Sequence, residues 1–260
     1  MIRASLASIP ERERSLQQTV ASLLPQVDRL GIYLNGYGSV PDFLHDKRID
    51  VAHSQEHGDR GDAGKMFWTN AGDFDYYLAC DDDIIYPPDY AERMVAAIEQ
   101  YGRRALVGCH GALLRHNPED YYGSRGRVYH CLGTVDEPHS VHVIGTGAVA
   151  WHASLGITPD IFRAPNMADM WVSAWANERD IPRIVIPHAK GWLREAKGAG
   201  GETIWNASSR RTGGPMDTSE LQGRIARKTP WRATPLPETQ HATHRERAVV
   251  SIITYDRADA

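Results

Sequence analysis

The sequence lacks several features that define whole classes of protein. It has only three cysteines, Cys80, Cys109 and Cys131, and no CxxC spacing. This argues against a disulfide framework or a zinc ribbon and predicts a reducing, cytoplasmic location. No run of 18 apolar residues occurs, and no apolar stretch follows the first residues, so we expect neither a transmembrane segment nor a signal peptide. Lys and Arg number 29 against 33 Asp and Glu, which argues against a generally basic nucleic-acid-binding protein.

Strand-like and helix-like segments alternate over the first two thirds of the 260 residues. Short apolar segments predict strands at 2–9, 30–35, 49–52, 76–80, 105–109 and 184–186. Apolar residues at helical spacing predict helices over 11–24, after the proline pair 87–88, and over 166–178, where Trp171 and Trp175 are expected to face the core. This order indicates an α/β fold with a mostly parallel central sheet flanked by helices. Such sheets bind ligands beyond the carboxyl ends of their strands, which draws attention to the loops at 7–12, 35–38, 57–65 and 81–86.

Composition divides the chain into three regions. We expect a core over residues 1–200, within which 111–152 is β-rich and contains many histidines. Residues 201–247 have the composition of a polar extension, with one short helix at the capping-box spacing of Asp217 and Glu220 and a linker over 229–247. Residues 248–260 start with a buried-strand pattern. That pattern fits either an extra edge strand or the start of a truncated second domain C-terminal to residue 260.

Three adjacent carboxylates, Asp81, Asp82 and Asp83, follow the apolar segment YYLAC and precede IIYPP. Neighbouring carboxylates repel one another and lose solvation when buried, unless a cation neutralises them. Mg²⁺ and Mn²⁺ take such oxygen ligands and leave positions for phosphate oxygens. In an extended segment Asp81 and Asp83 would share a face. We therefore expect a metal site, the alternative being a solvated acidic turn.

The segment YYLACDDDIIYPPDY resembles the DxD segment of GT-A-fold glycosyltransferases, especially the family-two-like enzymes of bacterial surface-polysaccharide synthesis. The resemblance covers roughly residues 1–200, and further segments match in order: ASIPER at 7–12, YLNGY at 33–37, GDAGKM at 61–66, IGTGAVAWH at 144–152 and NMADMW at 166–171. It implies a GT-A-type sheet whose β-rich region lies on the acceptor side.

The resemblance also implies roles for individual residues. It places the nucleotide-sugar donor against Ala7, Ser8, Pro10, Arg12, Asn35, Asp62, Lys65, Asp81, Asp82, Gly145, Thr146 and Gly147. It implies Mn²⁺ or Mg²⁺ on Asp81, Asp83 and His188, and a catalytic base at Asp169. The family often has Glu-Asp where this chain has Ala168-Asp169, which puts any role of that glutamate in doubt.

Elementary chemistry allows both functional and structural interpretations of these residues. Asp169 falls in the first turn of its helix if Asn166 is the N-cap, and the helix dipole there favours a carboxylate able to accept a proton; it could equally serve only the helix end. His188 after a strand is as often structural as metal-binding. Lys65 does not complete a P-loop, because Asp59 stands at the first glycine position and Met66 follows Lys65.

The resemblance implies a metal-dependent inverting glycosyltransferase that moves a sugar from a nucleotide-diphosphate donor, with UDP favoured, to an acceptor hydroxyl on a glycan. Three alternatives remain: a non-catalytic nucleotide-sugar-binding half of a larger polymerase, a transferase acting on a protein or a modified nucleic-acid base, and a sugar nucleotidyltransferase. Residues 190–232 carry nine Lys and Arg against four Asp and Glu. This basic segment would fold over the diphosphate, face the acceptor or lie in solvent.

Overall fold

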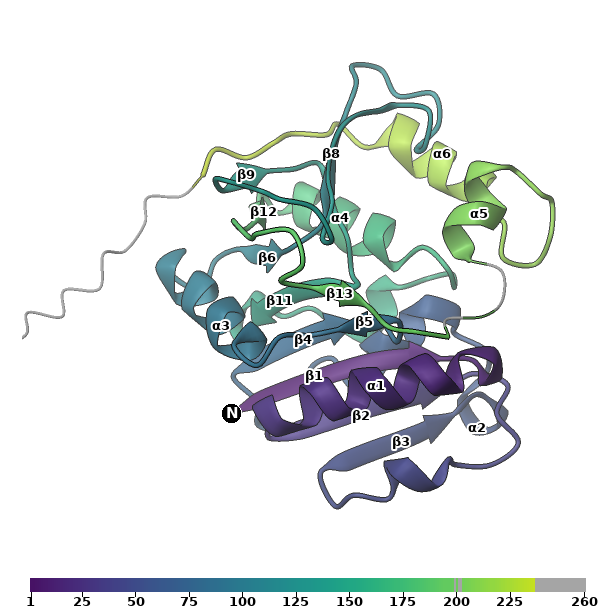
Figure 1. The fold of residues 1–260 in the computed structure, drawn as a ribbon. Coiled ribbons are helices and arrows are strands. Elements are labelled where there is room, and N and C mark those ends of the chain that lie inside the picture. Colours follow the sequence, from purple (N-terminus) through teal and green to yellow (C-terminus); the bar gives the residue numbers. More distant parts are fainter. Residues whose placement is uncertain (199, 201–202, 237–260) are drawn as a thin grey trace, which may run out of the picture.

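The computed structural model describes residues 1–198, 200 and 203–236, and its centre is an eight-stranded sheet (Figure 1). The strands lie in the order β3 (Ile49–His53), β2 (Arg29–Leu34), β1 (Ile2–Ser8), β4 (Tyr76–Cys80), β11 (Ala148–His152), β6 (Leu106–Gly108), β12 (Arg183–Val185) and β9 (His139–Ser140). The β3–β2–β1–β4 group is parallel, β12 runs parallel to β6, and β11 and β9 are antiparallel to their neighbours. The expected α/β fold with a mostly parallel, helix-flanked sheet is confirmed.

Helices cover both faces of this sheet. Helices α1 (Glu13–Leu23) and α3 (Tyr90–Gln100) pack on the face that receives Leu78 and Cys80 of β4. Helix α4 (Ala168–Glu178) packs on the opposite face, which receives Tyr77 and Ala79. The alternation follows from the two-residue period of a strand, and it makes β4 buried on both sides. In Figure 1, α1 lies over β1 and β2.

The helices differ in detail from the sequence prediction. Helix α3 begins at Tyr90, after the proline pair, and buries Tyr90, Met94 and Ile98 as expected. The N-cap of α4 is Met167, not Asn166. Trp171 and Trp175 are partly buried and pack against two core clusters, so the prediction that they face the core is confirmed in part. The fully buried residues of α4 include Met170, Val172 and Ala176.

Two small sheets and short helices complete the fold. Strands β10 (Val143–Ile144), β7 (Gly111–Leu114) and β8 (Arg125–Tyr129) form one small sheet, and β13 (Arg194–Glu195) pairs with β5 (Ile84–Ile85). The short helices are η1 (Pro10–Arg12), η2 (Leu24–Gln26), η3 (Asp42–Leu44), α2 (Ser54–His57), η4 (Gly61–Met66), η5 (Ala153–Leu155) and η6 (Pro159–Ile161). The β-rich character expected of 111–152 is present. Within the described ranges no helix has the length and apolar character needed to cross a bilayer.

The polar extension contains two helices where the sequence predicts one. They are α5 (Ile204–Ser209) and α6 (Ser219–Lys228), and the N-cap of α6 is Thr218 rather than Asp217. Ala226 of α6 is fully buried in one cluster with Met167 and Met170, so α6 packs on the first turn of α4. The predicted strand at 248–253 lies outside the described residues.

Arg183 fixes the segment after α6 to the core. Its side chain is fully buried on β12 and donates hydrogen bonds to the carbonyl oxygens of Val141 (3.2 Å), Ile181 (3.0 Å) and Arg232 (2.6 Å). It also contacts the side-chain oxygen of Asn177 at 3.3 Å, and that oxygen accepts the Arg232 N–H at 3.0 Å. Burial lowers the pKa of Arg183 to about 10. Residues 229–232, expected to be linker, are therefore part of the packed structure.

We predict that Arg183→Met lowers the free energy of unfolding by about 2–4 kcal/mol, because several buried acceptors lose their donor at once. Urea unfolding followed by circular dichroism measures this loss. Arg224→Met, at an exposed position of α6, is the matched control and should stay within about 0.5 kcal/mol of wild type. Equal stability of the two variants would contradict the anchoring role of Arg183.

Candidate functional site

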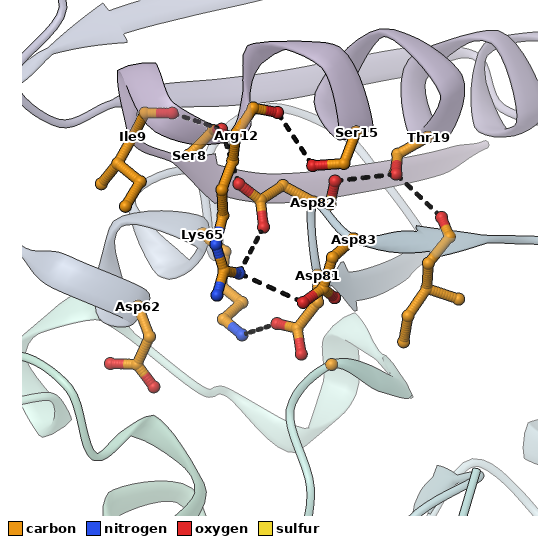
Figure 2. Close-up of polar contacts among 12 residues, drawn as sticks. Ser8, Ile9, Arg12, Ser15, Thr19, Asp62, Lys65, Asp81, Asp82 and Asp83 are labelled. Carbon is orange, nitrogen blue, oxygen red and sulfur yellow. Dashed lines mark hydrogen bonds and ion pairs between the residues drawn. The ribbon is translucent and has the colours of Figure 1, made fainter. Parts of the chain in front are cut away.

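The acidic segment after β4 is a tight turn and not the extended strand that the sequence suggested. Asp82 and Asp83 lie in the turn, and Asp81 and Asp83 each contact a different cation, Lys65 and Arg12 (Figure 2). The turn is held from α1, where the Thr19 hydroxyl lies 3.0 Å from the Asp82 carbonyl oxygen and 2.8 Å from that of Ile84. The hydroxyl of Tyr86 accepts the Asp81 N–H at 2.9 Å. The backbone thus fixes three carboxylates at the carboxyl end of β4.

Asp82 faces the protein interior. It is 3% exposed, accepts the Ser8 hydroxyl at 2.6 Å and accepts Arg12 Nη1 at 3.0 Å. The same Arg12 nitrogen lies 3.2 Å from Asp83 Oδ2. The Asp82 oxygens fix Ser8 and Arg12, at the end of β1 and in η1, to the acidic turn. A contact of Asp82 with the nucleotide-sugar donor stays a prediction.

Lys65 lies between the acidic turn and two more carboxylates. Its side chain is 4% exposed and Nζ is 2.5 Å from Asp81 Oδ1. Burial by itself would lower the pKa of Lys65, but the charges of Asp81, Asp62 and Asp169 raise it above its ordinary value. Lys65 is therefore a fully charged ammonium group that carboxylates from three different segments surround.

Asp62 and Asp169 meet at the start of α4. Asp62 Oδ2 accepts the Ala168 N–H at 3.0 Å, while Asp62 Oδ1 is buried without a hydrogen-bond partner. Asp62 therefore caps the helix, in place of the expected Asn166, which has φ +61° and accepts the Asp62 N–H at 3.3 Å. Burial raises the pKa of Asp62 to about 6, and the charge of Asp169 adds to this against the attraction of Lys65.

The loop before β11 orients Asp169 and makes room for Asp81. Asp169 Oδ1 accepts both the backbone N–H and the hydroxyl of Thr146, each at 2.6 Å. A Cβ on Gly147 would lie 2.0 Å from Asp81 Oδ2, and one on Gly145 would lie 2.9 Å from the His110 ring. The two glycines of this loop therefore lie in close contact with side chains of the protein itself, Gly147 with Asp81 and Gly145 with His110.

The remaining residues predicted to contact the nucleotide-sugar donor lie at the ends of β1 and β2. Asn35 is 5% exposed; its amide donates to the Gly61 carbonyl at 3.0 Å and accepts the Arg60 N–H at 3.2 Å. Asn35 thereby fixes η4, and with it Lys65, to β2. Ala7 is partly buried in β1, and Pro10 is exposed as the first residue of η1.

His188 is not positioned as the expected metal ligand. It is 4% exposed, and its two ring nitrogens lie 2.9 Å and 3.2 Å from the carbonyl oxygens of Ile186 and His130. Over the described part of the chain, no three His, Cys, Asp or Glu side chains gather as metal ligands. A neutral imidazole has one N–H, so it donates to only one of these two carbonyl oxygens. The predicted set of Asp81, Asp83 and His188 is therefore not gathered as one metal site among the described residues.

Two carboxylates nevertheless fit a hard divalent cation. Each has one oxygen on a cationic side chain, Asp81 on Lys65 and Asp83 on Arg12. Asp81 Oδ2 and Asp83 Oδ1 take no hydrogen bond from the described residues, and the side chains are 41% and 29% exposed. Mg²⁺ is commonly held by one or two carboxylates together with phosphate oxygens and water.

Negative charge exceeds positive charge in this site. Five carboxylates, from Asp62, Asp81, Asp82, Asp83 and Asp169, face the two cations of Arg12 and Lys65. Burial and the charges of Asp81 and Asp82 raise the pKa of Asp83 to about 6, despite Arg12. The arrangement can therefore accept further positive charge at the acidic turn.

Sequence reasoning missed two residues of the site, Tyr86 and Thr19. The Tyr86 hydroxyl lies 2.5 Å from the Gly147 carbonyl oxygen as well as contacting Asp81. It thus links the acidic turn to the glycine loop. A tyrosine in the apolar run IIYPP gives no local signal of such a role, and Thr19 lies within an ordinary amphipathic helix.

Comparisons with known proteins give distant structural similarities. No protein-family model and no curated protein matches the sequence. Glucosyl-3-phosphoglycerate synthase from Mycobacterium tuberculosis, in complex with Mn²⁺, UDP-glucose and phosphoglyceric acid, aligns with 69% of this chain at 15% identity and a TM-score of 0.43. The alignment spans 65% of that protein, slightly under two thirds of its length.

Nucleotidyl transferases are also similar. One from Methanothermobacter aligns with 87% of this chain and 98% of its own length, at 14% identity and a TM-score of 0.47. The inositol-1-phosphate CTP transferase from T. maritima aligns with 87% of this chain and 95% of its own length, at 11% identity and a TM-score of 0.41. Similarities at these levels assign neither a family nor an activity to this chain.

The raised pKa of Asp62 predicts a pH-dependent stability. The folded state keeps the Asp62 proton up to about pH 6, whereas the unfolded chain releases it near its ordinary value of 3.8. The contribution of Asp62 to the free energy of unfolding should therefore fall as the pH rises from about 4 to about 6 and then stay level. Asp62→Asn removes the Asp62 share of this slope and should stabilise the protein at pH 7 by about 1–3 kcal/mol.

Urea unfolding at a series of pH values tests this. The difference in free energy of unfolding between Asp62→Asn and wild type should grow between pH 4 and pH 6. The pH dependence that remains comes from other groups, among them Asp82 and Asp83, whose pKa values are also raised. Asp73→Asn, at an exposed position, should change the free energy of unfolding by the same amount at every pH or not at all. A constant difference for Asp62→Asn across this range would show that Asp62 is ionised throughout.

Proposed function

We propose that the protein is a metal-dependent glycosyltransferase that moves a sugar from a nucleotide-diphosphate donor to an acceptor hydroxyl with inversion. One observation carries this proposal: the carboxylate excess at the carboxyl end of β4 lies beside Asp169, with Lys65 between them. Sheets of this kind bind ligands at that edge, and the order of motifs resembling GT-A-fold glycosyltransferases supports the assignment.

The donor diphosphate is proposed to bind at the acidic turn. Asp81 and Asp83 would hold Mn²⁺ or Mg²⁺, which offsets the charge that develops on the leaving diphosphate. Arg12 and Lys65 hold the carboxylates in place from η1 and η4. UDP is the proposed donor nucleotide, on the sequence resemblance.

Asp169 is the proposed base. Thr146 occupies Oδ1 with two donors, which orients the carboxylate and leaves Oδ2 to accept the proton of an acceptor hydroxyl. The acceptor oxygen forms a bond to the anomeric carbon as the bond from that carbon to the diphosphate oxygen breaks on the opposite side. The proton stays on Asp169 until solvent takes it. The proposed acceptor is a hydroxyl of a glycan.

We predict that UDP with Mn²⁺ raises the melting temperature of the wild type by about 5 °C at roughly 100 times the dissociation constant. GDP, CDP and ADP serve as comparison nucleotides in the same thermal-shift assay. Asp83→Asn should abolish the Mn²⁺-dependent part of the shift. Asp136→Asn, an exposed acid on another segment, should retain it. A wild type that no nucleotide stabilises would refute the transferase proposal.

We predict that Asp169→Asn lowers the rate of sugar transfer, or of donor hydrolysis by water, by about 10²–10⁴-fold. Because Asp169 does not contact the acidic turn directly, the UDP–Mn²⁺ thermal shift should remain within a degree of wild type. Chromatographic detection of released UDP from UDP-glucose and UDP-galactose measures the rate. A wild type that binds nucleotide but releases none from either donor would favour a non-catalytic binding domain.

A further inference from the structure

A hollow lies on the outer side of α4, away from the acidic turn. It has a volume of about 410 Å³ and is enclosed by α4 and the segment from η5 to η6. This volume falls within the range of roughly 300–1,000 Å³ that is typical of small-molecule sites. Its side chains include Asp160, Arg163, Trp171, Trp175, Glu178 and Arg179.

The hollow and the proposed base lie on different faces of one helix. An α-helix has 3.6 residues per turn, so Trp171 and Trp175 project roughly 200° and 240° around the axis from Asp169. They are also four residues apart, which places both positions on one face of the helix. A ligand in the hollow would therefore not occupy the position of the reacting groups.

Both indoles line the hollow, where solvent reaches part of each. Trp171 Nε1 donates to the Ala164 carbonyl oxygen at 3.1 Å, which fixes the ring orientation. The Arg179 guanidinium carbon lies 4.6 Å from the centre of the Trp175 ring. Both indoles remain partly exposed. Each indole packs against a core cluster on its inner side, Trp175 near Val172 and Trp171 near Met170, and lines the hollow with the rest of its surface.

The charged groups that line the hollow beside the indoles carry equal numbers of positive and negative charges. Two carboxylates, from Asp160 and Glu178, accompany two guanidinium groups, from Arg163 and Arg179. Arg179 pairs with Glu178 at 3.5 Å. Asp160 and Arg163 make no ion pair within the described residues and are exposed. Such a rim offers hydrogen-bond donors and acceptors in similar number but no net charge, which disfavours a polyanion and a cation alike.

We propose that this hollow is a carbohydrate-binding site for a neutral oligosaccharide, distinct from the site of transfer. The apolar face of a pyranose ring stacks on an indole, and its hydroxyls are both donors and acceptors, as the balanced rim requires. The proposal goes beyond the proposed function, because a sugar would bind here whether or not the chain transfers one.

Saturation-transfer NMR and calorimetry on the full chain, without nucleotide, test the site. The probes are maltotriose, cellotriose and N-acetylchitotriose, with trigalacturonic acid as the anionic counterpart. At least one neutral trisaccharide should bind. Trp175→Ala should weaken its binding at least tenfold, whereas Trp175→Phe should stay within threefold. Trp205→Ala, which removes a tryptophan that is 53% exposed on α5, should have no effect.

Further variants separate this site from the catalytic one. Asp160→Ala and Arg163→Ala change exposed residues and should each weaken binding severalfold, which keeps the test valid if Trp175→Ala misfolds. Binding should be unchanged in Asp83→Asn and Asp169→Asn. The proposal fails if no neutral trisaccharide binds, if only trigalacturonic acid binds, if the hollow variants leave binding intact, or if the Asp83 or Asp169 variant abolishes it.

Discussion

The confinement of like charges at the end of β4 determines how the surrounding segments are arranged. Three consecutive carboxylates in a turn that is partly buried repel one another and require compensation. Arg12 from η1 contacts Asp82 and Asp83, and Lys65 from η4 contacts Asp81. Both cations are held by the chain and do not diffuse away, so the compensation is built into the fold. It is also incomplete, because Asp62 and Asp169 add further negative charge around Lys65. The net negative charge that remains favours the binding of one more positive group at this site.

Segments far apart in the sequence meet at this point, and each brings a specific contact. The end of β1 supplies the Ser8 hydroxyl to Asp82, and the loop before β11 supplies Thr146 to Asp169. Tyr86 joins the acidic turn to the same loop through the Gly147 carbonyl oxygen. Because these contacts link four elements of the sheet edge, displacement of one changes the position of the others. The geometry around Asp169 therefore depends on segments that are far from it in the sequence.

The sequence predicted the sheet well because its strands and helices have clear periodicity. The β4 pattern YYLAC is buried on both faces, as a central strand must be, and α1 and α3 follow their apolar stripes. Local rules failed where a distant side chain decided the outcome. Asp62 from η4 caps α4, which no spacing near Asn166 could indicate. His188 and Asp82 were given ligand roles from their neighbours in the sequence, and in the structure both contact distant segments, His188 at the His130 carbonyl oxygen and Asp82 at Ser8. Trp171 and Trp175 pack against core clusters on one side and line a hollow beside η5 and η6 on the other.

The antiparallel course of β11 has a consequence for how this architecture can vary. Gly108, at the end of β6, pairs directly with Val149 at the start of β11. Between them the chain leaves the central sheet for β7, β8 and β10 and returns to it once on the way, through the edge strand β9 that pairs with β12. The connection between β7 and β8 contributes no strand to the central sheet, so its length and sequence can change without altering the register of that sheet. Variation there would change the surface beside α6, where Arg227 contacts the Glu119 carbonyl oxygen, while β4 and the acidic turn keep their place.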